Sequence, residues 1–358
     1  MNDVFQDLVV VELASALAGP SAGMFFAELG AKVIKIENGP IGGDVTRRWK
    51  LKVETEEDPY SAYYHCTNWG KQSLMLDLKT EADQSMVHQM VCDADIVISN
   101  FRSDSAASLK MDYHYLKSIN PQIIYGSITA YGVDDPRPGF DALMQAETGW
   151  MSINGPADGL PTKMPVALID LFAGHQLKQG ILVAILKRQQ TNEGSHVTVS
   201  LYDASLASFA NQSSAYLNLG VHPVRQGSAH PSIAPYGDIV ETGDGTTYIL
   251  AVGTDDQFQG LCEAIGLSEM KSDPRFISNL LRQEHRKDLM SALGNAVSKM
   301  TSYEFEQRCD DYNVPIGPIK ELSDVLGEEA AQSLILEEVL EDGRVSRRVK
   351  TAVFRMLS

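Results

Sequence analysis

The chain of 358 residues has few cysteines, no long apolar run and no basic leader. Its four cysteines are scattered without a C-x-x-C pair, so neither the ligand spacing of a zinc site nor a disulfide framework is present. No apolar stretch approaches the ~18 residues that cross a bilayer. The first residues, Met1-Asn2-Asp3-Val4, lack the basic segment that begins a signal peptide. We therefore expect a cytoplasmic protein with reduced thiols and no membrane partner.

Positive charge is scarce, with 30 Lys and Arg against 47 Asp and Glu and a net charge of −17. Non-specific binding to nucleic acid or to an anionic membrane needs a cationic surface, so neither partner is expected. An anionic small molecule would need basic side chains concentrated in one place. Such a concentration exists near the N-terminus: Lys32, Lys35, Arg47, Arg48, Lys50, Lys52 and Lys71.

Common catalytic motifs are missing as well. The sequence contains no G-x-S-x-G elbow, no P-loop and no H-E-x-x-H zinc motif. Of its eight histidines, the two closest in sequence, His222 and His230, are eight residues apart. Because metal ligands on one helix recur at shorter spacing, we expect no metal site.

Apolar residues make up 44% of the chain and charged residues 22%, which is typical of a soluble globular protein. The first 130 residues alternate between strand and helix patterns, and this alternation predicts an α/β fold with a parallel, doubly wound, Rossmann-like sheet. The expected strands are 8–13, 33–37, 74–78, 94–99 and 123–128, with helices at 20–30, 80–92 and 112–118.

The second half predicts a smaller domain after a loop at 220–236 that is rich in Pro and Gly. Before this loop we expect helices at 140–151, 172–189 and 202–218 and a strand at 196–201. After it we expect a hairpin over 237–252, turning at Asp244-Gly245, and helices near 255–265 and 283–299. We therefore predict a large domain of residues 1–219, completed by 315–358, and a small α+β domain of 220–314. Residues 352–354 are expected to return to the large domain as a strand.

The first strand, helix and strand imitate a dinucleotide-binding unit. Glu37 closes the second strand about 20 residues after a glycine turn, which is the position of the ribose-binding acid in such units. The turn itself, Gly19-Pro20-Ser21-Ala22-Gly23, is not the G-x-G-x-x-G fingerprint. An NAD site is therefore disfavoured.

Asp170 follows the apolar run 166–169, and a helical pattern begins directly after it. This run predicts a buried strand, and an acid at the carboxyl end of such a strand lies where open α/β sheets bind ligands. Asp is also one of the best helix N-caps, so a capping role is the alternative interpretation. The residues alone leave both open.

Several stretches, in the same order along nearly the whole chain, make this sequence resemble the class III CoA-transferase family, which also includes the 2-methylacyl-CoA racemases. The matching stretches are Val10–Glu37, Gly42–Arg47, Asn68–Leu78, Asn100–Arg102, Asn120–Ile128, Gly139–Asp141 with Gln145–Glu147, Val197–Asp203 and Ala229–Tyr236.

The resemblance implies a discontinuous Rossmann-like domain, a small domain, and a homodimer in which two chains interlock like links. It implies acyl-CoA and a small carboxylic acid as partners, with coenzyme A as co-substrate and no further cofactor. Asp170 takes the position of the family's nucleophile. With an ordinary pKa near 3.9 it would be ionised and would need no activating base.

The resemblance also suggests which residues contact coenzyme A, although it transfers unevenly. Many members have a basic residue at the positions where this chain has Asn38 and Ser108. Arg47, Arg48 or Arg102 are the candidates to supply the missing positive charge. The expected coenzyme-binding residues are Leu17, Ala18, Asn38, Asn68, Lys71, Asn100, Phe101, Arg102 and Arg137.

In the substrate pocket, Asp141 falls where transferases carry an acid near the nucleophile. The racemase branch has a histidine at the preceding position, where this chain has Phe140, so two-base epimerisation is disfavoured. The loop that holds His230, Ser232 and Tyr236 resembles members that handle dicarboxylates, and these residues are expected to bind a distal carboxylate or simply to form a turn. The reaction expected is CoA transfer to a free acid, with a dicarboxylate as the expected acceptor. The alternatives are an acyl-CoA racemase or isomerase, and a non-catalytic acyl-CoA-binding relative.

Overall fold

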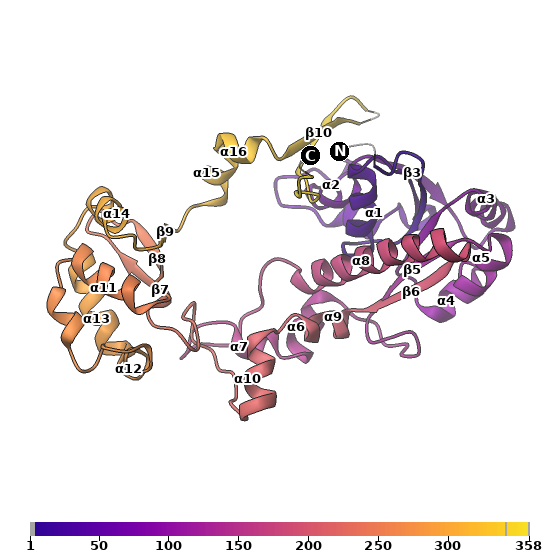
Figure 1. Cartoon of the computed structure of the whole chain (residues 1–358). Helices are drawn as coiled ribbons and strands as arrows, with labels where there is room; N and C mark the ends of the chain where they lie inside the picture. Colours follow the sequence, from indigo (N-terminus) through magenta and orange to yellow (C-terminus); the bar gives the residue numbers. More distant parts are fainter. Residues whose placement is uncertain (1–3, 341, 357–358) are drawn as a thin grey trace. The chain divides into compact units, whose positions relative to one another are not determined.

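The computed structural model describes residues 4–340 and 342–356 (Figure 1). Contacts divide the chain into two units. The first comprises residues 1–150, 164–213 and 329–358, and the second comprises 151–163 and 214–328. The sequence placed the boundaries after 219 and 314, whereas the contacts place them after 213 and 328 and assign 151–163 to the second unit.

A six-stranded sheet forms the centre of the first unit, in the order β3-β2-β1-β4-β5-β6. Every neighbouring pair is parallel, and the strand order reverses between β1 and β4, as in doubly wound folds. The predicted fold class is therefore confirmed. The strands are β1 (Val9–Leu13), β2 (Lys32–Asn38), β3 (Lys71–Leu76), β4 (Ile96–Ser99), β5 (Ile124–Thr129) and β6 (Ser195–Ser200).

The sheet is buried because helices cover both of its faces. On one face, α1 (Ala18–Glu28) and α8 (Leu168–Thr191) pack over side chains such as Val10 of β1. On the other, α3 (Glu81–Cys92) and α5 (Tyr113–Ile119) pack over side chains such as Val11. Adjacent residues of a strand point to opposite faces, which explains why the central strands are mostly apolar, with Glu12 as the charged exception in β1.

The predicted strand before Asp170 is wrong. Helix α8 begins at Leu168 with Ala167 as its N-cap, and Val166 is 52% exposed. Within the apolar run 166–169 only Ile169 is buried, and it begins the buried helical face that continues at Ala173, Leu177 and Ile181. Asp170 lies in the first turn of α8, so the interpretation as an N-cap is wrong as well.

Two predicted helices are each divided into two. The helix expected at 140–151 is interrupted by Gly149, whose φ is 98°, and the one expected at 202–218 is interrupted by Ala210, whose φ is 47°. Left-handed residues cannot continue a right-handed helix. The resulting pairs are α6 (Asp141–Glu147) with α7 (Trp150–Ile153), and α9 (Leu201–Ala207) with α10 (Asn211–Leu219).

The remaining elements of the first unit are short. They are α2 (Ala62–Asn68), α4 (Ser103–Ser108), α16 (Glu329–Gln332) and the 3₁₀ turns Gly39–Ile41 and Val45–Arg48. In the part of the chain that the structure describes, no helix is long and apolar enough to cross a membrane.

The second unit is an α+β structure built on an antiparallel sheet in the order β7-β8-β9. The predicted hairpin is present, and Gly245 in its turn has a φ of 83°. The elements are β7 (Tyr236–Glu241), β8 (Thr247–Ala251), β9 (Ile316–Pro318), α11 (Asp255–Ala264), the 3₁₀ turn Ser268–Ser272, α12 (Asn279–Glu284), α13 (Arg286–Val297), α14 (Ser302–Asp311) and α15 (Leu322–Gly327).

The chain returns to the first unit through the hairpin β10 (Ile335–Val339) and β11 (Val345–Val349). Arg348 forms a buried ion pair with Glu28 of α1, and the N–H groups of Thr351 and Ala352 also donate to Glu28. The prediction that residues 352–354 add a strand is wrong, because this segment is held on α1 by a side chain instead.

Glu28 therefore holds β11 and the residues that follow it against α1. We expect Glu28→Ala to lower the free energy of unfolding by about 3 kcal/mol, because it leaves Arg348 buried without its partner. The matched control is Glu337→Ala on the same hairpin, whose partner Arg347 is 65% exposed. This control is expected to lose less than about 1 kcal/mol. Urea denaturation monitored by circular dichroism measures both, and equal losses would contradict the clamping role of Glu28.

Candidate active site

A cavity of about 590 Å³ opens at the carboxyl ends of β1, β4 and β5, on either side of the point where the strand order reverses. This is where open α/β sheets bind ligands. Eight residues expected from the sequence line it: Leu17, Ala18, Asn100, Phe101, Arg102, Arg137, Asp141 and Asp170. The structure therefore brings together residues that lie up to 153 positions apart in the chain.

Asp170 extends into this cavity from the first turn of α8. Burial and the nearby Asp141 carboxylate raise the pKa of Asp170 to about 7. The expectation of an ordinary carboxyl group is therefore wrong. Removal from water and a neighbouring negative charge both disfavour the ionised form, so near neutral pH the group is divided between its two forms.

Asp141 is fixed rather than mobile. One carboxylate oxygen accepts a hydrogen bond from the N–H of Ile169 at 3.0 Å, and the other accepts one from Gln145 Nε2 at 2.8 Å. Gln145 Oε1 in turn accepts from the N–H of Met164 at 2.8 Å. Asp141 thus caps the helix that carries Asp170, and it holds the chain that leads into that helix.

The N-terminus of α1 faces the same cavity, which Leu17 and Ala18 line. Among residues 4–340 and 342–356 no side chain caps this helix. The first N–H groups of a helix have no partner within the helix, and they lie at its positive end. They are therefore suited to stabilise a negatively charged oxygen beside Asp170.

An aromatic wall completes the cavity, formed by Trp49, Tyr63 and Phe140. The rings of Trp49 and Tyr63 meet edge to face at 5.1 Å. Burial and nearby acidic groups, including Cys66, Asp170 and Asp141, raise the pKa of Tyr63 to about 12, so its hydroxyl stays protonated and able to donate. Sequence reasoning missed Trp49 and Tyr63, because both lie in a polar stretch with no periodic pattern.

A second, largely apolar cavity of about 380 Å³ adjoins the first and shares Ser15 and Phe101 with it. It lies beyond the ends of β2 and β3, where Asn38 and Leu76 line it. Two joined cavities, one holding a carboxylate and one apolar, suit an elongated ligand with a reactive end and a flat, weakly polar end.

Glu37, which imitated a ribose-binding acid, is engaged within the protein. Its oxygens accept hydrogen bonds from Arg47 at 2.7 Å on each side, from Tyr64 at 2.9 Å and from Ser73. Burial alone would raise the pKa of Glu37, but the hydrogen bonds from Arg47 and Ser73 outweigh it and lower the pKa to about 2. Since its oxygens are occupied, the geometry does not support an NAD site.

Comparison with known proteins identifies the family of this chain. The model of the family described as CoA-transferase family III matches residues 5–357. The chain belongs to CoA-transferase family III.

The chain is 39% identical over 352 residues to the succinate–glutarate CoA-transferase of Agrobacterium fabrum, covering 96% of this chain and 87% of that protein. It is 33% identical to the acetyl-CoA:oxalate CoA-transferase of Acetobacter aceti, covering 93% of this chain and 85% of that protein. Among solved structures, a CaiB/BaiF family protein from Brucella suis superimposes with a TM-score of 0.86 at 34% identity, covering 99% of this chain and 93% of that one. The predicted family is confirmed, and the chain is a transferase.

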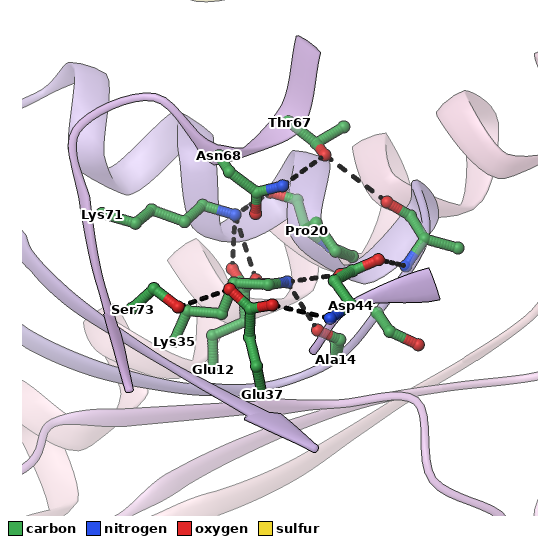
Figure 2. A network of polar contacts seen from close by, with 12 residues as sticks. Glu12, Ala14, Pro20, Lys35, Glu37, Asp44, Thr67, Asn68, Lys71 and Ser73 are labelled. Atoms are coloured by element: carbon green, nitrogen blue, oxygen red, sulfur yellow. Dashed lines mark hydrogen bonds and ion pairs between the residues drawn. The ribbon is translucent and has the colours of Figure 1, made fainter. Parts of the chain in front are cut away.

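Two residues at family coenzyme positions do not line either cavity. Lys71 donates to both oxygens of Glu12, at 3.0 and 2.7 Å, and to the carbonyl oxygen of Pro20 (Figure 2). Burial lowers the pKa of Lys71 to about 8. Asn68 donates to the carbonyl oxygen of Tyr64 at 2.9 Å. Both side chains hold the protein itself together.

The basic residues at the cavity differ in how available they are. Arg102 and Arg137 have side chains 53% and 60% exposed, paired with Asp104 and Asp135 on the surface. Arg47 is bound to Glu37, so it does not replace the basic residue lost at position 38. Arg48 is exposed and donates to a backbone carbonyl. Arg102 and Arg137 line the larger cavity and the exposed Lys79 lines the apolar one, so a phosphate can reach these cations, whereas Arg48 lines neither cavity.

His230, Ser232 and Tyr236 belong to the second unit, where they contact one another. The N–H of Ser232 donates to His230 Nδ1 at 3.1 Å, and the rings of His230 and Tyr236 meet at 5.4 Å. Arg286 donates to the carbonyl oxygen of His230 at 2.8 Å. The loop is thus an ordered turn with polar side chains.

The raised pKa of Asp170 predicts how its replacement affects stability. The folded protein holds the proton more tightly than the unfolded chain, so the contribution of Asp170 to stability is greatest below pH ~4 and declines as the pH rises towards 7. We therefore expect Asp170→Asn to raise the Tm by about 2–4 °C at pH 8 and to leave it nearly unchanged at pH 4.5.

Thermal denaturation at the two pH values measures this difference. Asp135→Asn is the control, because Asp135 forms a surface pair and its pKa is lowered by hydrogen bonds from Arg137. A gain for Asp170→Asn that is the same at both pH values would contradict the raised pKa.

Proposed function

We propose that the protein transfers coenzyme A from an acyl-CoA to a free carboxylic acid, with small dicarboxylic acids as the substrate class, through a covalent thioester on Asp170. The observation that carries the proposal is the Asp170 carboxyl group in a cavity that the uncapped N-terminus of α1 also faces. Family membership supports the reaction type.

In the first step, an oxygen of ionised Asp170 attacks the thioester carbonyl carbon. The C–S bond breaks, the CoA thiolate leaves with the electron pair, and a mixed anhydride forms between Asp170 and the acyl group. Negative charge develops on the former carbonyl oxygen, where the N–H groups of Leu17 and Ala18 stabilise it.

In the second step, the thiolate attacks the Asp170 carbonyl carbon of the anhydride. The C–O bond breaks, the first acid leaves as its carboxylate, and an aspartyl-CoA thioester remains. The acceptor carboxylate then attacks this thioester, and the same two steps run in reverse to give the new acyl-CoA. The reaction consumes no proton, electron or water molecule. Because water is not a reactant, a cavity that excludes it protects the anhydride and the thioester from hydrolysis.

The two joined cavities support an extended coenzyme. We place the thioester of acyl-CoA beside Asp170 and the adenine base of coenzyme A in the apolar cavity that Asn38 lines. Asn100 and Phe101 then lie along the coenzyme between these two ends. Arg102 and Arg137 are the proposed phosphate contacts. Asn68 and Lys71 support this site through the protein network described above.

Names of the relatives support a dicarboxylate as acceptor. They include a succinate–glutarate enzyme and, at 34% identity, the succinyl-CoA:mesaconate CoA-transferase of Haloarcula hispanica. We propose that His230, Ser232 and Tyr236 of the second unit bind a carboxylate of such an acid. We further propose that the active protein is a homodimer, as the family resemblance implies.

The lining of the cavity favours transfer over racemisation. Epimerisation at the carbon next to the thioester needs two bases, one on each side. Among the described residues no histidine lines the cavity, and the position before Asp141 is the apolar Phe140, which is 62% exposed. Asp141 is engaged in capping α8.

Trapping the thioester tests the proposal directly. The protein is incubated with succinyl-CoA, reduced with borohydride and digested, and the peptides are mapped by mass spectrometry. We expect reduction of the side chain at Asp170 and at no other carboxyl group, with none in Asp170→Asn. If acyl-CoA binds but Asp170 stays unmodified with every thioester offered, the protein is a non-catalytic acyl-CoA-binding relative.

The pH dependence of the reaction follows from the pKa of about 7 for Asp170. Only the ionised form attacks, so kcat/KM is expected to rise about tenfold between pH 6 and pH 8 and then to level off. Asp141→Asn keeps the capping oxygen but removes the neighbouring negative charge. It should therefore move the midpoint to lower pH; a midpoint unchanged or moved upwards would contradict the assignment of the profile to Asp170.

A further inference from the structure

The turn between β1 and α1 is held by side chains from other elements at each residue from 14 to 16. Lys35 Nζ donates to the carbonyl oxygen of Ala14 at 2.8 Å (Figure 2). Asn100 accepts from the N–H of Ser15 at 3.1 Å and donates to the carbonyl oxygen of the same residue at 2.8 Å. Since Ser15 lines both cavities, this turn forms their shared wall.

Ala16 is the most constrained residue of the turn. Its φ is 66°, in the left-handed region that residues with a Cβ rarely adopt. Asp44 Oδ1 accepts from its N–H at 3.3 Å, and Thr67 Oγ1 donates to its carbonyl oxygen at 3.5 Å. The peptide groups on both sides of the strained residue are therefore held from outside the turn, and Ala16 immediately precedes the N-terminus of α1.

Asp44 is itself fixed by buried partners. Its Oδ2 pairs with Lys35 at 2.9 Å, and its Oδ1 also accepts from the N–H and the hydroxyl of Thr46 at 2.9 and 2.8 Å. Lys35 pairs in addition with Glu12 at 2.9 Å. Asp44 is among the residues that line the apolar cavity, but its side chain is 0% exposed, so its carboxylate acts through the residues it holds.

We propose that Asp44 is a positioning residue for acyl transfer. By holding Ala16 in its left-handed conformation, it directs the first N–H groups of α1, at Leu17 and Ala18, towards the carbonyl that Asp170 attacks. The inference rests on the proposed function. It assigns to the Asp44 carboxylate a part in the chemical step, although this carboxylate never meets the substrate.

The experiment compares Asp44→Ala with Asp95→Ala. Asp95 is a matched control at the other end of β1, where it accepts from the N–H of Val9 at 2.9 Å and pairs with Arg188 at 2.9 Å. The single-turnover rate of Asp170 acylation by succinyl-CoA and the Kd for coenzyme A are measured for both variants, together with the Tm.

We expect Asp44→Ala to slow acylation about 100-fold, as the loss of an oxyanion donor does, while the Kd for coenzyme A changes less than fivefold. Asp95→Ala should acylate within threefold of the unaltered protein at a comparable loss in Tm. Equal slowing in the two variants would overturn the inference, and so would weaker binding of coenzyme A with an unchanged rate of acylation. Absence of acylation in the unaltered protein would instead overturn the proposed function.

Relief of the strain provides a second test. Glycine adopts the left-handed conformation freely, so Ala16→Gly added to Asp44→Ala should restore acylation at least tenfold. If Asp44→Ala does not fold, Thr67→Val removes the other hold on Ala16 with little change in side-chain volume and should slow acylation about tenfold. No rescue by Ala16→Gly, or an unchanged rate in Thr67→Val, contradicts the positioning role.

Discussion

Glu12 is the buried charge on which the geometry of the site depends. It lies in β1 and is shared by two buried lysines, Lys35 and Lys71. Lys35 also pairs with the buried Asp44. Burying these four charges together is costly unless every polar atom finds a partner, and such clusters tolerate few alternative arrangements. Here the two ammonium groups also bind backbone carbonyls, those of Ala14 and Pro20. The cluster thereby fixes both the end of β1 and the first turn of α1.

The cavity combines that rigid turn with a carboxyl group whose ionisation is disfavoured. Asp170 is buried beside Asp141, so its charged form is less stable than in water. A carboxylate that is poorly solvated in the resting protein is a better nucleophile, because little solvent has to be removed when it attacks. In the proposed mechanism, the uncapped helix end beside it stabilises the negative charge that leaves Asp170 in the transition state. In that mechanism one arrangement both destabilises the ionised resting carboxylate and stabilises the transition state.

The sequence predicts the parallel sheet because short apolar runs such as Val9–Val11 and Ile96–Ile98 are separated by helix-length segments. It does not predict the element that carries Asp170. A four-residue apolar run fits either a strand or the first turn of a helix, and only packing decides between them. The run joins helix α8 because Ile169 lies on the same buried helical face as Ala173 and Leu177.

The candidate site is predictable for residues within or beside the stretches that resemble the family in the same order along the chain, such as Leu17, Asn100 and Asp170. Trp49 and Tyr63 could not be found, since they reach the cavity from a segment without periodicity. The pKa of Asp170 could not be found either, because it depends on burial and on Asp141, which is 29 residues away in the chain. Lys71 falls on a coenzyme position in sequence, yet its ammonium group is committed to Glu12.

The central claim is that a carboxylate of the protein exchanges its oxygen with the substrate acid. The most direct measurement is a single turnover of the aspartyl-CoA form with an acceptor acid labelled with ¹⁸O in both carboxylate oxygens, followed by mass spectrometry of the peptide that contains Asp170. One labelled oxygen should pass from the acid to Asp170 and raise the peptide mass by about 2 Da, since the anhydride breaks on the acyl side. Formation of the new acyl-CoA with an unlabelled Asp170 would contradict the account.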